Sequence, residues 1–171
     1  MPWPAVRRIL QTSSDVLSLY AQFAAVEGSD LGTAIKSSSW LFPAIEAVHL
    51  LALALLGGSL LLLDLRLLGA GLTLQPTSAV ERETRPWLIS ALTAMVVSGV
   101  LIGCSEALKL YDKPAFWVKM ATLATAAIFT FAIKLPLARR DVAGLTAKAL
   151  AILSLALWLM VALAGRWIGF S

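Results

Sequence analysis

Residues 40–68 read WLFPAIEAVHLLALALLGGSLLLLDLRLL, and this stretch decides the fold. A helix needs roughly 20 apolar residues to cross the hydrocarbon core of a bilayer, and this segment is long enough. It holds the only histidine, His49, with Glu46 one turn before it and Asp64 near its far end. At helical spacing, positions 46, 49, 53, 56, 60 and 64 share one face. Because a carboxylate or an imidazole facing lipid is expensive, this face is predicted to look into a protein interior.

The composition is that of an integral membrane protein. Of the 171 residues, 59% are hydrophobic and 14% are charged, and the mean hydropathy is +0.84. Soluble domains carry about 25% charged residues. The net charge of +4 comes from residues beside the apolar segments, which indicates contact with lipid headgroups and argues against nucleic-acid binding. The single cysteine, Cys104, excludes an intrachain disulfide and any Cys-x-x-Cys motif.

Three further apolar segments follow, so the sequence predicts an all-α fold, a four-helix transmembrane bundle. The expected spans are residues 41–63, 86–105, 115–133 and 149–165. Pro86 is expected to begin the second span, and Pro136 is expected to end the helix of the third. Gly99 and Gly103 form a GxxxG pair, which lets another helix approach closely. Short connections after the second and third spans make consecutive helices antiparallel neighbours.

Residues 1–39 precede the first span and are predicted to form an interfacial helical segment, separate from the bundle of residues 40–171. A first amphipathic helix is indicated by residues at helical spacing, with Asp15 near its start: Val16, Tyr20, Phe23 and Glu27. Ser29 is placed to cap a second short helix over residues 30–36. Both helices are too short and too polar to cross a membrane, so we expect them to lie on its surface.

The distribution of basic residues predicts the orientation. The loops after the first and third spans are richer in lysine and arginine than the opposite side, with Arg66, Arg82, Arg85, Lys134, Arg139, Arg140 and Lys148. Such loops face the cytoplasm by the positive-inside rule. We therefore expect a multi-pass membrane protein with both termini outside the cytoplasm. Asp64 and Arg66, at the inner end, are expected to snorkel or to pair with Arg82 or Glu83 in a structural role.

The predicted topology brings five polar residues toward the outer membrane face. Glu46 and His49 lie early in the first span, Glu106 ends the second, Lys119 lies near the start of the third, and Arg166 ends the fourth. Lys119 also heads a stripe of small and polar residues suited to a bundle interior: Thr122, Ala126 and Thr130. Ionisable residues inside a membrane are functional-site hypotheses by default.

Three interpretations compete for this group. In the first, His49 is an axial ligand of haem b and Glu46 orients its imidazole. Lys119 or Arg166 pairs with a propionate, and Met120 lies at a suitable depth for a second ligand. In the second, His49 is a metal ligand in a copper-handling protein, since imidazole and soft sulfur ligands suit copper. In the third, Glu46 pairs with Lys119 and the group only fixes helix packing, as in a non-catalytic accessory subunit of a larger membrane complex.

Four runs of the chain resemble an uncharacterised family of bacterial four-span membrane proteins. The runs are SSSWLFPAIEAVHLLALALLGGSLLLLDLRLLG (37–69), RPWLISALTAMVVSGVL (85–101), YDKPAFWVKM (111–120) and LAGRWIGF (163–170). A histidine early in the first span and a lysine early in a later one, here His49 and Lys119, are more distantly similar to CopD-type copper-resistance and HemJ-type haem-pathway proteins.

That resemblance favours haem or copper binding over a purely structural role. The expected function is therefore a haem b-binding or electron-transfer protein surrounded by membrane lipids. The resemblance places it in the bacterial inner membrane, with both termini in the periplasm. It is expected to act alone, as a homo-oligomer, or as a subunit of a larger membrane redox complex.

Overall fold

The computed structural model describes residues 17–169, and every regular element in that range is helical. Residues 17–27 are helical and are followed by α2 (Asp30–Ser37), α3 (Leu41–Leu68), α4 (Thr77–Ser105), α5 (Ala107–Tyr111), α6 (Pro114–Ile128), the π-helix η1 (Phe129–Lys134), α7 (Leu135–Ala138) and α8 (Gly144–Ile168). Four stretches in this range are long and apolar enough to cross a membrane: α3, α4, α6 through α7, and α8. The predicted all-α, four-span fold is confirmed, and the chain is a multi-pass membrane protein.

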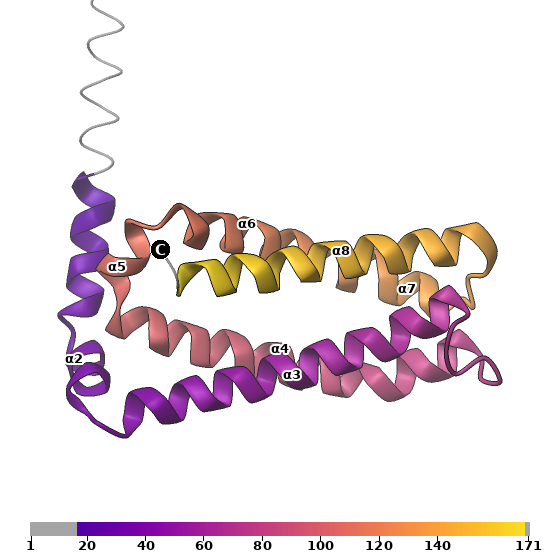
Figure 1. The fold of residues 1–171 in the computed structure, drawn as a ribbon, viewed down its shortest axis with the longest axis horizontal. Helices are drawn as coiled ribbons and strands as arrows, with labels where there is room; N and C mark the ends of the chain where they lie inside the picture. The colour runs from indigo at the N-terminus through magenta and orange to yellow at the C-terminus, as the bar shows by residue number, and fades with distance from the viewer. Residues whose placement is uncertain (1–16, 170–171) are drawn as a thin grey trace, which may run out of the picture.

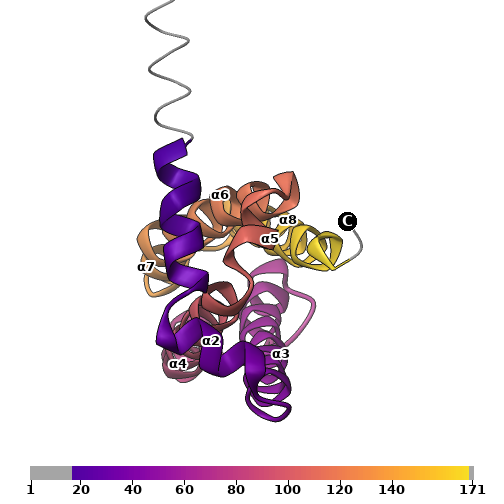
Figure 2. The ribbon, with the colours of Figure 1, turned by 90° about the vertical axis from the view of Figure 1, so that its left-hand side faces the viewer.

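The spans form two antiparallel pairs. The third and fourth spans are neighbours as predicted, whereas the second span meets the third mainly through contacts between α4 and α7. α3 packs against α4, the third span packs against α8, and contacts between α3 and α8 join the two pairs. One end of the bundle, here called the α7 end, carries α7 and the connections that follow α3 and precede α8 (Figure 1). The opposite end, called the α2 end, carries α2, α5 and the helix of residues 17–27, which lies across the ends of the spans (Figures 1 and 2).

The second span begins earlier than the sequence predicted. α4 starts at Thr77 and runs through Pro86, which was expected to be its first residue. Proline lacks an N–H, so the carbonyl of Arg82 loses its helical partner there. The residues around this carbonyl are polar (TSAVERETR, 77–85), which places it at the wet edge of the membrane, where water can bond to it. The prediction was wrong because proline costs little at such a position.

The third span also continues past its predicted end. The chain remains helical through Pro136 to Ala138, so this proline does not end the span. Immediately before α7, Phe129–Lys134 is wound as a π-helix. π-Helical segments insert an extra residue into a helix and occur frequently at functional sites. Lys134, which the sequence assigned to a loop, is fully buried in the bundle at the end of this segment.

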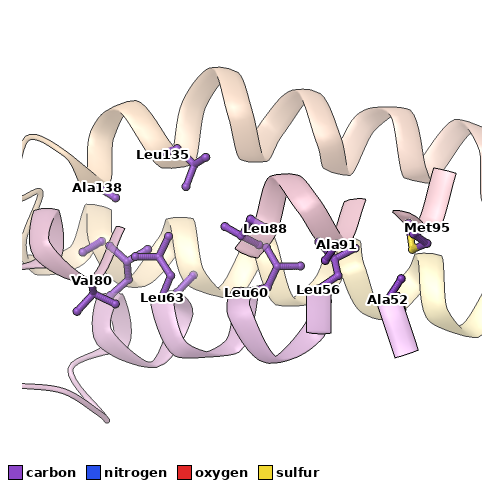
Figure 3. Packing of buried hydrophobic residues seen from close by; sticks show 13 residues of the cluster. Ala52, Leu56, Leu60, Leu63, Val80, Leu88, Ala91, Met95, Leu135 and Ala138 are labelled. Carbon is purple, nitrogen blue, oxygen red and sulfur yellow. The ribbon is translucent and has the colours of Figure 1, made fainter. Parts of the chain in front are cut away.

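The apolar core is concentrated in the half of the bundle nearer the α7 end (Figure 3). Its members are Ala52, Leu56, Leu60, Leu63, Leu67, Val80, Leu88, Ala91, Met95, Leu135, Ala138, Ala147 and Ala151. α3 contributes from Ala52 onward and α4 only as far as Met95, so the cluster stops partway along both helices. The predicted inward face of α3 is confirmed at Leu56, Leu60 and Asp64, whereas Glu46 on the same face is exposed.

α2 docks closely on the last turn of α4. The predicted cap is confirmed, since the Ser29 hydroxyl accepts a hydrogen bond from the backbone N–H of Gly32 at 3.2 Å. A Cβ atom at Gly32 would lie 2.6 Å from the carbonyl oxygens of Cys104 and Glu27, so only glycine fits. Asp15 and Val16, which the sequence placed at the start of the preceding helix, lie outside the described residues.

Gly32→Ala is therefore expected to displace α2 from α4. The added methyl group meets backbone on two sides, and overpacking of this kind costs about 1–3 kcal/mol. Limited proteolysis of the detergent-solubilised protein should show faster cleavage between residues 28 and 40. Gly57→Ala is the matched control, because a Cβ at Gly57 meets nothing within 4 Å. Equal cleavage of the two variants would contradict the tight contact.

Glu27 ties the N-terminal helices to the corner between α4 and α5. Its carboxylate accepts hydrogen bonds from Lys36 Nζ at 2.5 Å and from the backbone N–H of Leu108 at 2.9 Å. These bonds, the one from Lys36 most of all, lower the pKa of Glu27 below its ordinary value of 4.5. Because the pKa of Glu27 is lower in the folded than in the unfolded chain, these bonds stabilise the fold fully at a pH above the unfolded pKa. This stabilisation is lost as the pH falls through the folded pKa.

Acidification below pH 4.5, the ordinary pKa of Glu27, is accordingly expected to loosen α2 from the bundle. Protonation removes the charge that holds Lys36 and weakens the bond from Leu108. Cleavage between residues 28 and 40 by an acid-active protease should rise as the pH falls through this range. Glu27→Gln should show high cleavage at every pH, and a wild-type profile that stays flat would rule out this linkage.

Candidate functional site

His49 lies on α3 in the α2 half of the bundle and faces α4. Its Nδ1 atom is 2.9 Å from the Ser98 hydroxyl oxygen. Gly99 makes this approach possible, because a Cβ there would lie 3.2 Å from His49 Cε1. The GxxxG pair predicted for close packing thus admits the imidazole at its first glycine.

The partners of His49 determine which ring nitrogen carries the proton. The Ser98 hydroxyl donates its hydrogen to the carbonyl of Ala94 at 2.6 Å, so toward the ring its oxygen accepts. Nδ1 therefore carries the hydrogen, and in a neutral imidazole Nε2 then presents its lone pair. A hydrogen-bonded Nδ1–H that fixes the ring and leaves Nε2 available is the usual arrangement of a histidine that ligates a metal.

Lys119 is the second predicted residue that the structure brings to this site. It lies on α6 and packs its alkyl chain against α8, where a Cβ at Gly165 would be 3.5 Å from Lys119 Cε. The charges of Lys119 and Glu46 both lie close enough to act on the His49 ring. Neither His49 nor Lys119 is fully buried, because the apolar core ends before their level. A cation and an imidazole from different helix pairs thus share the α2 half of the bundle.

The other predicted site residues are placed differently. Glu46 is exposed and makes neither a hydrogen bond nor an ion pair within the described residues, so the expected Glu46–Lys119 pair does not form. Glu106 is at the junction of α4 and α5, where its carboxylate pairs with Lys109 at 3.0 Å. Arg166 is exposed in the last turn of α8.

A second polar cluster, which sequence reasoning missed, lies in the half nearer the α7 end. Lys134 Nζ donates hydrogen bonds to Asp64 Oδ1 at 2.9 Å and to Ser154 Oγ at 2.7 Å, while Ser154 Oγ donates to Asp64 Oδ2 at 2.8 Å. The three side chains come from α3, η1 and α8, and all three are buried. The prediction that Asp64 snorkels or pairs with Arg82 was wrong, because its carboxylate bonds to Lys134 and Ser154 inside the bundle. We call this group the Asp64–Lys134–Ser154 triad.

One sequence signal pointed to the triad. Lys134 follows Thr130 by four residues and so extends the polar stripe that begins at Lys119. The structure continues the stripe across helices, because Trp158 Nε1 donates a hydrogen bond to Thr130 Oγ1 at 3.1 Å, one turn from Lys134 and from Ser154. Lys134 was predicted to follow the end of the third span, whereas the helix of that span continues to Ala138.

Few side chains are placed to ligate a metal together. Within residues 17–169, no three side chains among histidine, cysteine, aspartate and glutamate are grouped so that they could hold a metal ion. A metal at His49 would therefore need methionine sulfur, or a cofactor that supplies its own ligands. Met95, the methionine of α4, is buried beside Ala52, which lies one turn along α3 from His49 (Figure 3).

Comparison with known proteins gives one match. A family model described as a family of unknown function (DUF6644) matches residues 22–171. No curated protein and no solved structure matches the chain.

Proposed function

The chain belongs to the DUF6644 family, whose function is unknown, and from its own residues we propose that it binds haem b through His49 and transfers electrons in the membrane. The observation that carries the proposal is the fixed His49 ring, with Nδ1 bonded to Ser98 and the Nε2 lone pair available. Ser98, rather than the exposed Glu46, holds the ring in this orientation.

The surroundings of His49 suit an apolar group with acidic substituents. The core cluster stops near Ala52 and Met95, before the level of His49, so this cluster does not join the two helix pairs there. Lys119 supplies a positive charge for one propionate, and Arg166, at the end of α8, lies at the membrane edge where a second propionate would emerge. Bound haem would supply one-electron chemistry. The chain would hold the iron and neutralise the propionates.

Copper handling is the second candidate, and the position of Met95 favours it. A thioether and an imidazole are both good ligands for Cu(I), and Met95 packs beside Ala52, one turn along α3 from His49 (Figure 3). The distant likeness to CopD-type proteins supports the same alternative, just as the likeness to HemJ-type proteins supports haem.

The proposed setting is a bacterial inner membrane, with the α2 end outside. Even without Lys134, the α7 end carries an excess of basic residues: Arg66, Arg82, Arg85, Arg139, Arg140 and Lys148. These residues favour the cytoplasmic side by the positive-inside rule. Haem near the outer face would then exchange electrons with a periplasmic partner or with another subunit, in a homo-oligomer or a larger redox complex.

The deciding experiment is pigment and metal analysis of protein purified from its native membrane. Haem binding predicts a Soret band and stoichiometric iron, whereas copper handling predicts a colourless protein that retains copper. A protein that is colourless, contains no copper and does not take up added haem would refute both, and would leave the accessory-subunit interpretation.

A further inference from the structure

We propose that the α7 end carries a binding site for the headgroup of an anionic phospholipid, formed by Arg82, Arg85 and Arg139. The site is a hollow of about 570 Å³ between the first turns of α4 and the end of α7. Its lining residues are Ser78, Glu81, Arg82, Arg85, Pro86, Ile89 and Arg139. It lies at the opposite end of the bundle from His49 and does not depend on the haem proposal.

The charges of the hollow favour an anion. Three arginines face one carboxylate, Glu81, which is 3% exposed and accepts a hydrogen bond from Arg139 Nε at 2.9 Å. Because this bond uses Nε, the terminal amino groups of Arg139 keep their donors for a ligand. Arg82 is exposed, and its Nε lies 3.9 Å from a carboxylate oxygen of the equally exposed Glu83. An exposed ion pair of this kind is too weak to keep Arg82 from binding a phosphate.

The arginine side chains also have suitable chemistry. Guanidinium groups bind phosphate oxygens through pairs of parallel hydrogen bonds, which a phosphate headgroup can accept from more than one arginine. The buried Glu81 fixes one of the three in place, so the hollow is partly organised before a ligand arrives.

The hollow lies where the headgroup region meets the hydrocarbon, and this position identifies the ligand as an amphiphile rather than free phosphate. On α4 its lining recurs at positions 78, 82, 85 and 89, which share one helix face. Along that face the chemistry changes from Arg82 and Arg85 to Pro86 and Ile89. Trp87, 58% exposed, lies at the same level, as tryptophans do where the headgroup region meets the hydrocarbon. A phosphate at the arginines would thus have its acyl chains running along Ile89.

Native mass spectrometry of the full chain in an uncharged detergent tests the proposal, with phosphatidylglycerol and phosphatidylcholine as probes. The wild type should retain phosphatidylglycerol in preference to phosphatidylcholine. The double variant Arg82→Gln/Arg85→Gln should bind phosphatidylglycerol about 30-fold more weakly, since each arginine near an anionic lipid contributes about fivefold. Arg139 is left intact because its loss would strand the buried Glu81.

Arg140→Gln is the matched control. Arg140 is exposed, lies next to Arg139 and carries the same charge, but does not line the hollow. Its substitution should leave phosphatidylglycerol binding unchanged. The proposal is overturned if Arg140→Gln lowers the affinity for phosphatidylglycerol by the same factor per arginine removed as the double variant does. That result would mean that the basic surface attracts the lipid without a defined site. Equal retention of the two lipids, or displacement of phosphatidylglycerol by an equal concentration of inorganic phosphate, would also overturn it.

Discussion

Asp64→Leu is expected to lower the free energy of unfolding by about 3–5 kcal/mol, the cost of breaking a buried ion pair from one side. In the folded protein the side chains of Asp64 and Lys134 are 1% and 0% exposed. Without the carboxylate, the Lys134 ammonium would keep only the Ser154 hydroxyl as a partner, in an interior that water does not reach. Lys134→Met is expected to have a comparable cost, because it strands the carboxylate instead.

The double variant Asp64→Leu/Lys134→Met tests whether the cost of each single substitution comes from leaving the other charge buried without its partner. Replacing both charges with apolar side chains of similar volume removes the desolvation cost along with the attraction, so the double variant should be more stable than either single one. The freed Ser154 hydroxyl can bond to the carbonyl one turn earlier in α8. Unfolding titrated with SDS in mixed micelles gives the free energies.

Arg82→Gln/Glu83→Gln serves as the control for this series. Those side chains are 79% and 78% exposed and 3.9 Å apart, so their neutralisation should leave the unfolding titration unchanged. If Asp64→Leu unfolds at the same SDS fraction as the wild type, the triad does not hold the helices together.

His49→Ala is expected to abolish haem binding, because it removes the proposed iron ligand. The variant should show no Soret band after incubation with haem. Since His49 is only partly buried, the fold should persist, and SDS titration should give an unfolding midpoint near that of the wild type. Haem uptake by His49→Ala with an unchanged spectrum would exclude His49 as the ligand.

Two further variants separate ligation from positioning. Ser98→Ala removes the group that orients the ring, and loss of such a partner weakens metal or cofactor affinity about 10- to 100-fold while the ligand remains. Its Soret band should therefore persist at high haem concentration. Lys119→Met should also keep the band and lower haem affinity through the lost propionate contact. If His49→Ala, Ser98→Ala and Lys119→Met all bind haem with the affinity of the wild type, haem binds elsewhere.

Some features of the site followed from local pattern, and others did not. His49 and Lys119 were predicted together because helix spacing and antiparallel order place both early in their spans on the same side of the membrane. Ser98 was not predicted, since a serine in a membrane helix usually bonds to its own helix, as Ser98 also does with Ala94. Its second role depends on how α3 is rotated against α4, which no residue spacing specifies.

The sequence alone determined the all-α class, the number of spans, their order and the cap at Ser29, because these depend on hydropathy, length and short-range hydrogen bonds. Only the tertiary structure decided that Asp64 meets Lys134 and Ser154, 70 and 90 residues away. That meeting requires the π-helical segment before Pro136 and the contact between the two helix pairs. The physical reason is that a helix period predicts which residues share a face, whereas the choice of partner depends on the packing of the whole bundle.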